Sequence, residues 1–477
     1  MPIRLYNSLT QDVEVLQPLH PGRVQMYTCG PTVHDRAHIG NFRTYLAEDL
    51  LRRHLEARHL KVEQVMNITD VDDKIIAKAT ARGETLAEFT APFIEDFFRD
   101  LDLLGIERAE QFPRATEYLG PMLALVERLV TTGHAYESEG SVYFRLATFP
   151  SYGRLSRLDV KGLSAGASGR IDSDEYEAKE AVRDFALWKA GSEGDLAAWP
   201  SPFGWGRPGW HLECSAMAME LLGESIDIHC GGVDNKFPHH ENEIAQSEAA
   251  TGQPFVRLWF HVEHLVVEGG NKMAKSQGNF LTLPTLIERG HSPLAVRYHL
   301  LGNTHYRQRL HFREEDLVGA SESLDRLATF WRRCAAAHGG ELKTAGSGDP
   351  LTVAAQRARD RFEAAMDDDL NLPLALGSLH DLVREGNRLL DEGRAGGDGC
   401  GATLSTLRSA DSRLAVIERA AVSEDSQLSP EEQQALGRRE EARRKGNFSK
   451  ADRIRDQLLE LGIVVEDTKE GTRWHRV

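Results

Sequence analysis

The chain contains 477 residues, of which 41% are apolar and 27% are charged, a composition typical of a soluble protein with two to four domains. The N-terminus has no basic segment followed by an apolar run, and no stretch approaches the ~20 apolar residues that span a membrane, so we expect neither secretion nor membrane insertion. The five cysteines are scattered, odd in number and never arranged as Cys-x-x-Cys, which indicates reduced thiols and a cytoplasmic location.

The net charge of −16 disfavours general attraction to nucleic acid, because phosphate binding needs positive potential. Basic runs nevertheless occur at residues 36–53, 306–313 and, most densely, 438–450. Each run is either a stripe that holds a polyanion or a solvated helix face.

The first predicted strand is a β-prone run at 24–29 that stops at Gly30-Pro31, so Cys29 should lie at its carboxyl end. Ligands bind at that end in open α/β sheets. A helix should follow the sequence His38-Ile39-Gly40-Asn41, because leucines recur at helical spacing from 46 to 55.

A second apolar run at 62–68 and a helix containing Ile75 and Ile76 repeat this β–α unit. Acidic residues separate the run from the helix. For Asp72 and Asp73 we predict the first turn of that helix, where carboxylates favour the positive end of the helix dipole.

Between residues 121 and 202 the α/β pattern loosens into a helix at 122–132, a hairpin at 137–144 and a Gly/Ser/Asp-rich stretch up to 174. A segment of this length indicates an insertion between two halves of a sheet. Within it, Phe185, Leu187 and Trp188 are predicted to belong to an apolar core.

The stretch 209–246 gathers a thiol, imidazoles and carboxylates around a predicted buried strand, Ile226 to His229. The turn Cys230-Gly231-Gly232 lets a ligand approach the backbone, and Asp234 is a candidate for binding a pair of hydroxyls. A helix is predicted from about Pro238.

On that helix His239 and Glu243 are four residues apart, so both side chains can reach one metal ion. A pair with this spacing is more often an ordinary surface or core pair. Cys214 adds a possible ligand, although a free cysteine is most often a small buried apolar residue.

Residues 259–267 are predicted to form the last strand of the sheet. The glycine-flanked segment that follows carries Lys272 and Lys275. Two lysines on such a loop form a cationic clamp suited to a departing pyrophosphate.

From 314 to 421 the period indicates a helical bundle, with breaks near 371–373 and in the glycine-rich stretch 393–401. A capping box at 429–432 begins a new element, two helices meet at 445–449, and two short strands close the chain at 463–466 and 472–475.

Several of these motifs resemble bacterial cysteinyl-tRNA synthetases, a family of class I aminoacyl-tRNA synthetases. Gly209-Trp210-His211-x-Glu213-Cys214, Asp227-Ile228-His229 and His239-His240-Glu241-Asn242-Glu243 resemble the active-site core. His38-Ile39-Gly40-Asn41 resembles the HIGH signature with Asn41 in place of its last histidine, and Lys272-Met273-Ala274-Lys275-Ser276 resembles KMSKS with Ala274 in place of a serine.

The resemblance implies a Rossmann-like doubly wound parallel sheet split by an insertion, then an α-helical bundle and a small mixed anticodon-binding domain. The expected boundaries are 1–120 and 203–265 for the two catalytic halves, 121–202 for the connective insertion, 266–313 for the KMSKS and stem-contact region, 314–425 for the bundle and 426–477 for the anticodon-binding domain.

The implied reaction is the ATP-dependent attachment of L-cysteine to tRNA(Cys) through a cysteinyl adenylate, with Mg2+ accompanying ATP. The implied catalytic residues are His38, Asn41, Lys272 and Lys275. The implied substrate and ATP contacts are Thr69, Trp210, His229, Gly231, Gly232, Asp234 and Lys275. The enzyme is expected to be a cytoplasmic monomer.

The resemblance also implies one Zn2+ per subunit, held by Cys29, Cys214, His239 and Glu243. A borderline-soft ion binds the thiolate of cysteine and not the hydroxyl of serine, so no editing is expected. Whether Cys230 touches the metal stays open. His211, His229 and His240 are either neighbours of metal and substrate or satisfied core histidines.

At the C-terminus, Arg443, Phe448 and Asp452 fall where the family reads the anticodon, and the alternative is an ordinary helix hairpin. Two other functions compete with the synthetase. One is a ligase that joins cysteine to an amino-sugar inositol in mycothiol synthesis and lacks a full anticodon-binding tail. The other is a non-catalytic RNA-binding paralogue, which the intact set of expected site residues disfavours.

Overall fold

The computed structural model describes residues 2–157, 183–267, 280–339, 348–422, 430–461, 463–468 and 471–476. The chain forms two compact units. The first contains residues 1–321, 356–382 and 412–414, and the second contains 322–355, 383–411 and 415–477. Lys272, Lys275, Ser429 and the glycine-rich stretch 158–182 lie outside the described residues. In the described part of the chain no helix combines the length and apolarity that crossing a membrane requires.

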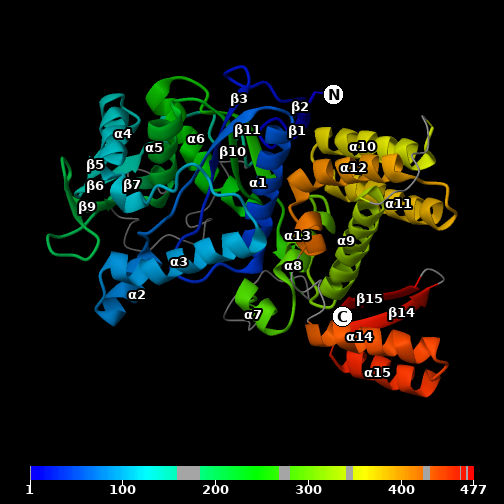
Figure 1. Cartoon of the computed structure of the whole chain (residues 1–477). Helices are drawn as coiled ribbons and strands as arrows, with labels where there is room; N and C mark the ends of the chain where they lie inside the picture. Colours follow the sequence, from blue (N-terminus) through cyan, green and yellow to red (C-terminus); the bar gives the residue numbers. More distant parts are fainter. Residues whose placement is uncertain are drawn as a thin grey trace. The chain divides into compact units, whose positions relative to one another are not determined.

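A four-stranded parallel sheet forms the centre of the first unit (Figure 1). Its strands, in spatial order, are β11 (Val256–Val262), β10 (Ile226–Gly232), β3 (Arg23–Thr28) and β4 (Lys61–Met66). Helix α1 (Ile39–Ala57) connects β3 to β4, and α6 (His239–Thr251) connects β10 to β11. The predicted α/β class and the strands at 24–29, 62–68 and 226–229 are confirmed.

The sheet is covered on both faces, with α1 on one side and α5 (Trp210–Leu222) and α6 on the other (Figure 1). Successive side chains of a strand point to opposite faces. Tyr27 and Cys29 accordingly pack with α5 and α6 residues such as Cys214 and Ile244. The leucine stripe of α1 is buried as predicted, at Leu46, Leu50, Leu51 and Leu55.

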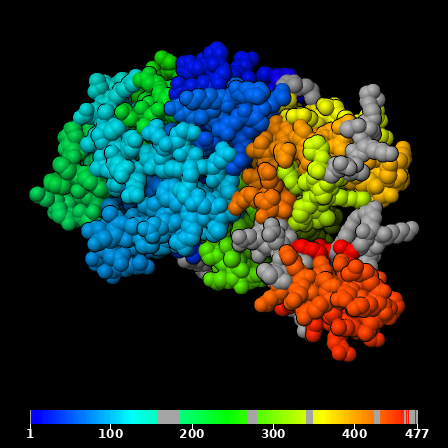
Figure 2. Space-filling view, in the orientation of Figure 1, coloured from blue at the N-terminus to red at the C-terminus, as the bar shows by residue number. Residues whose placement is uncertain are grey.

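The connection from β4 to β10 contains the predicted insertion. Helices α2 (Asp73–Arg82), α3 (Leu86–Leu104) and α4 (Leu119–Thr131) precede a five-stranded antiparallel sheet. Its strands in spatial order are β5 (Ala135–Ser138), β6 (Ser141–Phe144), β7 (Phe185–Ala190), β9 (Gly204–Pro208) and β8 (Trp199–Ser201). One apolar core joins these elements, and in the space-filling view α2 and α3 form an unbroken surface with their neighbours (Figure 2).

Two local predictions in this region are confirmed. Asp72 caps α2, since its carboxylate accepts a hydrogen bond from Ile75 N, and Asp73 lies in the first turn. Leu187 and Trp188 are completely buried in the core, and Phe185 packs against that core but is only partly buried.

The predicted strand at 259–267 is wrong in its extent. Strand β11 ends at Val262, and a separate two-residue strand, β12 (Leu265–Val266), pairs with β13 (Leu310–His311). Between them the main chain of Glu263 bonds elsewhere: its N–H donates to Tyr306 O, and its carbonyl accepts from the Arg43 side chain. The apolar pattern continues through the break because the last residues of β11 and both residues of β12 are buried.

The remaining elements of the first unit are a hairpin of β1 (Arg4–Asn7) and β2 (Asp12–Val15), α7 (Leu283–Glu288) and α8 (Pro293–Gly302). The helical region is confirmed as α9 (Asp316–Gly339), α10 (Pro350–Asp367), α11 (Leu372–Asp391), α12 (Gly397–Leu414) and α13 (Ile417–Val422). The unit division runs through α9 to α12.

The predicted break at 393–401 is only half correct, because α12 begins at Gly397. Its glycines serve close packing in the second unit. A Cβ on Gly399 would lie 2.6 Å from an Asp349 carboxylate oxygen, and that carboxylate accepts hydrogen bonds from Gly396 N and Gly399 N. Composition predicted a loop where the fold has a capped helix.

The C-terminal part of the second unit contains α14 (Pro430–Arg444), α15 (Phe448–Glu460), β14 (Ile463–Thr468) and β15 (Gly471–Arg476). The two strands predicted to close the chain are present, and they pair antiparallel. A small core of Ile454, Leu458, Ile463 and Val465 holds them to the helices.

Candidate active site

A cavity of about 690 Å³ opens at the carboxyl ends of β3 and β10 and the start of α1. Nine of the predicted site residues line it: Cys29, His38, Asn41, Thr69, Trp210, Cys214, Gly232, Asp234 and His239. They come from segments up to 210 residues apart in sequence, from Cys29 to His239. The fold therefore brings most of the predicted site together.

One end of the cavity, here called the thiol end, contains Cys29, Cys214, His239 and Glu243. One potential ligand atom from each of these side chains lies within 4.8 Å of the others. His239 Nε2 is 3.4 Å from Cys214 Sγ and 3.1 Å from Glu243 Oε1. Tetrahedral zinc with sulfur, nitrogen and oxygen ligands separates its ligand atoms by roughly 3.4–3.8 Å, so the donor set and spacing fit that ion.

The Glu243 carboxylate gives independent support for this fit. It is completely buried, and its Oε1 makes no hydrogen bond with the described residues, although His239 Nε2 lies 3.1 Å away. Burial raises the pKa of Glu243, while His229 lowers it. A buried carboxylate oxygen without a donor is costly unless a cation occupies the space it faces.

Hydrogen bonds hold these side chains in place. His229 Nε2 is 2.8 Å from Glu243 Oε2, and His239 Nδ1 is 2.9 Å from His211 Nδ1. Trp210 stacks on the His239 ring with centroids 4.2 Å apart. If His239 keeps Nε2 for a metal, its Nδ1 must carry the proton and donate to His211, which fixes both tautomers.

A second potential set shares two members with the first: Cys29, His229, His240 and Glu243. His240 Nε2 is 3.2 Å from Cys29 Sγ, and its Nδ1 is 2.8 Å from His261 Nε2. Burial lowers the pKa values of His240 and His261 well below the usual value, so both rings are neutral. This pair therefore orients Cys29 without adding positive charge.

Burial and thiol contacts also affect the two cysteines. The hydrogen bond with Cys214 and burial raise the pKa of Cys29. The contact with Cys29 lowers the pKa of Cys214, but burial and the Glu243 carboxylate outweigh it, so the net shift is upward. Without a cation both groups stay as thiols.

Cys230 belongs to neither ligand set. It follows His229 on β10 and therefore faces the opposite side of the sheet, where burial and, secondarily, the Glu48 carboxylate of α1 raise its pKa. Although Cys230 is close to His239 and Glu243 in sequence, its thiol does not join their ligand set.

The other end of the cavity, here called the nucleotide end, lies at the start of α1. His38 and Asn41 form a capping box: His38 Nδ1 accepts from Asn41 N at 3.2 Å, and Asn41 Oδ1 accepts from His38 N at 3.1 Å. Burial lowers the pKa of His38, so its ring is neutral with the proton on Nε2. His38 thus keeps an N–H donor, and Asn41 keeps its amide NH2 group.

Two adjacent glycines belong to different ends. A Cβ on Gly231 would lie 2.8 Å from His240 Cε1, so this glycine makes room for the thiol end and does not line the cavity. A Cβ on Gly232 would lie 2.5 Å from Asp234 Oδ1 at the nucleotide end. The Asp234 side chain is 58% exposed, and its Oδ1 lies 3.9 Å from His264 Nδ1.

Thr69 lies just beyond β4 and donates to Glu213 Oε2 at 3.1 Å. Burial raises the pKa of Glu213 well above the usual value. His229 and Glu243 stand behind the cavity surface and not on it.

Arg443, Phe448 and Asp452 surround the turn between α14 and α15 in the second unit. Phe448 is 60% exposed although it is a large aromatic residue. Asp452 Oδ1 lies 3.5 Å from Arg455 Nη1.

Sequence reasoning missed Tyr27, Arg43 and His261 and gave Glu213 no role. The strand period could have identified Tyr27, since it lies two residues before Cys29 and shares its face. In the same way, His261 lies two residues after Trp259 on β11 and shares its face. Nothing in the local sequence marked Arg43, whose acceptors are distant main-chain and hydroxyl groups.

Comparison with known proteins agrees with this geometry. Residues 15–322 match the family model for the class I (C) tRNA synthetase catalytic domain, 361–416 match the DALR domain, and 425–474 match the cysteinyl-tRNA ligase anticodon binding domain. The last match covers the tail that distinguishes a synthetase from the amino-sugar ligase considered above.

Relatives that match over nearly their whole length are cysteine–tRNA ligases. The chain is 45% identical to Cysteine–tRNA ligase of Protochlamydia amoebophila (strain UWE25), covering 99% of this chain and 98% of that protein. It is 46% identical to Cysteine–tRNA ligase of Solibacter usitatus (strain Ellin6076), covering both completely. Methionyl-tRNA synthetase of Mycobacterium tuberculosis, solved with methionyl-adenylate, shares the fold with a TM-score of 0.61 at 16% identity, covering 84% of this chain and 92% of that one. The chain belongs to the cysteine–tRNA ligase family, the cysteinyl-tRNA synthetases of class I.

Proposed function

We propose that this protein attaches L-cysteine to tRNA(Cys) at the expense of ATP, and that a zinc ion at the thiol end recognises the cysteine side chain. The observation that carries the proposal is the set of Cys29, Cys214, His239 and Glu243, of which the first three line one end of a cavity whose other end lies at the start of a HIGH-like helix. Family membership supports the reaction, and the donor set supports the metal.

Zinc bound by these four residues would supply a borderline-soft centre that accepts the thiolate of cysteine and disfavours the hydroxyl of serine. The chain itself supplies the rest of the recognition. Trp210 stacks on His239, His229 donates to the Glu243 carboxylate, and His240 orients Cys29. A site that binds one specific group can discriminate by ~10⁴-fold or more against a substrate that lacks this group, which makes an editing step unnecessary.

At the nucleotide end, His38 Nε2–H and the Asn41 amide would donate to phosphate oxygens, and Asp234 would accept from ribose hydroxyls. Mg2+ would accompany ATP, and Lys272 and Lys275 would contact the departing pyrophosphate. Asn41 carries no charge, so its contribution is a directed hydrogen bond alone. These contacts position the reactants and stabilise phosphate charge.

The reaction needs two displacements. A carboxylate oxygen of cysteine attacks the α-phosphorus of ATP, and the bond to the β-phosphate bridging oxygen breaks to release pyrophosphate. A terminal ribose hydroxyl of the tRNA then attacks the cysteinyl carbonyl carbon, and the bond to AMP breaks as the hydroxyl proton leaves. The protein's task in both is alignment.

The tail at 426–477 would bind the anticodon, with Phe448 as a stacking platform and Arg443 and Asp452 as polar partners. The exposure of Phe448 supports this assignment. The domain boundaries predicted from the sequence, the cytoplasmic location and the monomeric state are parts of the same proposal.

The test is cysteine-dependent exchange of pyrophosphate into ATP, followed by charging of tRNA(Cys), with zinc measured on the same preparation. We expect about one zinc per chain, exchange with cysteine and negligible exchange with serine. Full activity without any bound transition metal, or equal use of serine, would refute the zinc proposal. Exchange without charging of tRNA would refute the synthetase function.

A further inference from the structure

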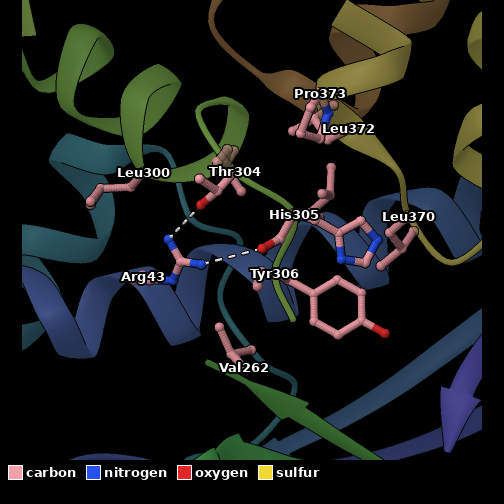
Figure 3. A pocket seen from close by; sticks show the side chains of 12 residues that line it. Arg43, Val262, Leu300, Thr304, His305, Tyr306, Leu370, Leu372 and Pro373 are labelled. Atoms are coloured by element: carbon pink, nitrogen blue, oxygen red, sulfur yellow. Dashed lines mark hydrogen bonds between the residues drawn. The ribbon is translucent and has the colours of Figure 1, made fainter. Parts of the chain in front are cut away.

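Arg43 is a buried cation on α1, two residues beyond Asn41, and only 3% of its surface is exposed. Its Nε donates to Glu263 O at 3.0 Å, and Nη1 donates to Thr304 Oγ1 at 3.3 Å. Its Nη2 donates to His305 O and Gln308 O. Figure 3 shows the guanidinium between α1 and the loop that carries Thr304 and His305.

None of these four acceptors is a carboxylate. Burial lowers the pKa of Arg43 to about 10, and the Glu263 carboxylate opposes that shift. Burying a cation against neutral acceptors is costly unless directed hydrogen bonds compensate it. One of these bonds goes to the Glu263 carbonyl, at the break between β11 and β12.

The residues at this break form a wall of the active-site cavity. Val262, Glu263, His264 and Leu265 all line it. His264 Nδ1 lies 3.9 Å from Asp234 Oδ1, which places this wall at the nucleotide end. Arg43 therefore joins the wall to the helix whose first turn contains His38 and Asn41.

The space beside the guanidinium leaves little room for repacking. The adjoining cavity, lined by Leu300, Tyr306 and Leu370 among others, has a volume of about 10 Å³, about one water molecule (Figure 3). A shorter side chain would leave separated acceptors that a single ammonium group cannot reach together, because lysine lacks the planar fork of arginine.

We propose that Arg43 is a positioning residue for ATP, which sets the distance between the start of α1 and the Glu263–Leu265 wall. This inference rests on the proposed function, since it takes ATP as the ligand of the nucleotide end. It predicts a selective defect: ATP binding should weaken while zinc and cysteine binding, at the other end of the cavity, should not.

Arg297 provides a matched control. It lies on α8, is completely buried, and donates to Asp49 of α1 and to the carbonyls of Leu104 and Leu414. These acceptors do not line the cavity. Arg297→Lys should thus cost stability without changing the nucleotide end.

The experiment compares wild type, Arg43→Lys and Arg297→Lys by steady-state pyrophosphate exchange, zinc content and equilibrium binding of a non-hydrolysable ATP analogue. We expect Arg43→Lys to raise the KM for ATP and the Kd for the analogue roughly tenfold or more, since small misplacements can cost up to about 10²-fold. The KM for cysteine and the zinc content should stay within about twofold of wild type. Arg297→Lys should change none of these.

ATP parameters that are unchanged in Arg43→Lys, or raised equally in both variants, would overturn the inference. If Arg43→Lys does not fold, Thr304→Val serves instead. It removes only the hydrogen bond from Arg43 Nη1 to Thr304 Oγ1 and should raise the KM for ATP about two- to threefold. An unchanged value there would also overturn it. A wild-type enzyme that exchanges no pyrophosphate would refute the proposed function instead, so the two failures are distinguishable.

Discussion

The two ends of the active-site cavity are built in different ways. The thiol end takes its side chains from the residue after β3 and from α5 and α6, and Cys214, His239 and Glu243 are buried. The nucleotide end combines the start of α1, the turn after β10 and the Glu263–Leu265 wall, and Asp234 there is more than half exposed. The difference follows from the ligands: selecting a thiol needs desolvated donors in fixed positions, whereas a nucleotide needs backbone and hydrogen-bond donors that it can reach from solvent.

The largest expected effect separates the two ends directly. Cys214→Ser should remove zinc and lower kcat/KM for cysteine on the order of 10³-fold, because a hydroxyl is a poor ligand for a borderline-soft ion. The KM for ATP should change little. Zinc analysis and pyrophosphate exchange at varied cysteine and ATP measure both.

Cys230→Gly is the control for that substitution. Cys230 is equally buried but lies on the opposite face of β10, so its removal should leave zinc in place and activity within about twofold. Equal loss of zinc in both variants would show that the ligand assignment is wrong.

The adjacent glycines offer a sharper comparison of the ends. Gly231→Ala would push against the His240 ring and should raise the KM for cysteine roughly tenfold or more. Gly232→Ala meets only the partly exposed Asp234 side chain, which can move, so it should raise the KM for ATP by a smaller factor. If both variants impaired the same substrate, the division of the cavity would not hold.

The anticodon proposal predicts an effect outside both ends. Phe448→Ala should raise the KM for tRNA(Cys) about tenfold, the loss of one base stacked on an aromatic ring. Pyrophosphate exchange should not change. Leu461→Ala, which truncates a similarly exposed apolar residue of the same unit, should leave charging intact. A defect in both would point to instability of the small domain.

The smallest expected effect is on the free energy of unfolding and comes from Asp100 on α3. The Asp100 carboxylate on α3 is buried, has no hydrogen-bond donor among the described residues, and has its pKa raised by burial to about 6. Because the folded pKa exceeds the unfolded one, stability falls as pH rises from about 4 to 6 and stays lower above that range.

Asp100→Asn should therefore raise the free energy of unfolding at pH 8 by about 1–2 kcal/mol and give no gain at pH 4, as measured by denaturant titration. Asp96→Asn is the contrast, since it loses the 2.6 Å ion pair with Arg36 and should not stabilise at either pH. A gain for Asp100→Asn that is the same at both pH values would rule out the ionisation argument.

Local sequence predicted the parallel strands and the helices well where one period was unambiguous. The leucine stripe of α1 and the cap at Asp72 depend on neighbours within a few residues. The predictions failed where a distant group decided the outcome. Glu263, at the break in the strand expected at 259–267, bonds to Arg43 and Tyr306, and Asp349 accepts hydrogen bonds from the backbone at the start of α12.

The same division applies to the site. The motifs of the sequence named the four potential ligands, and the structure brings them within 4.8 Å of one another. They left open whether Cys230 touches the metal, because tertiary packing decides which face of β10 is turned toward α5 and α6. They also could not supply the partners of the ligands, such as His261 at His240 and His211 at His239.

By itself, the sequence determined the family, the α/β class and the residue types of the site, because motifs and periodicity are properties of short segments. Only the tertiary structure decided which side chains share a cavity end, which buried groups lack partners, and which distant groups Arg43 joins. Those features arise from contacts between residues hundreds of positions apart, which no local pattern encodes.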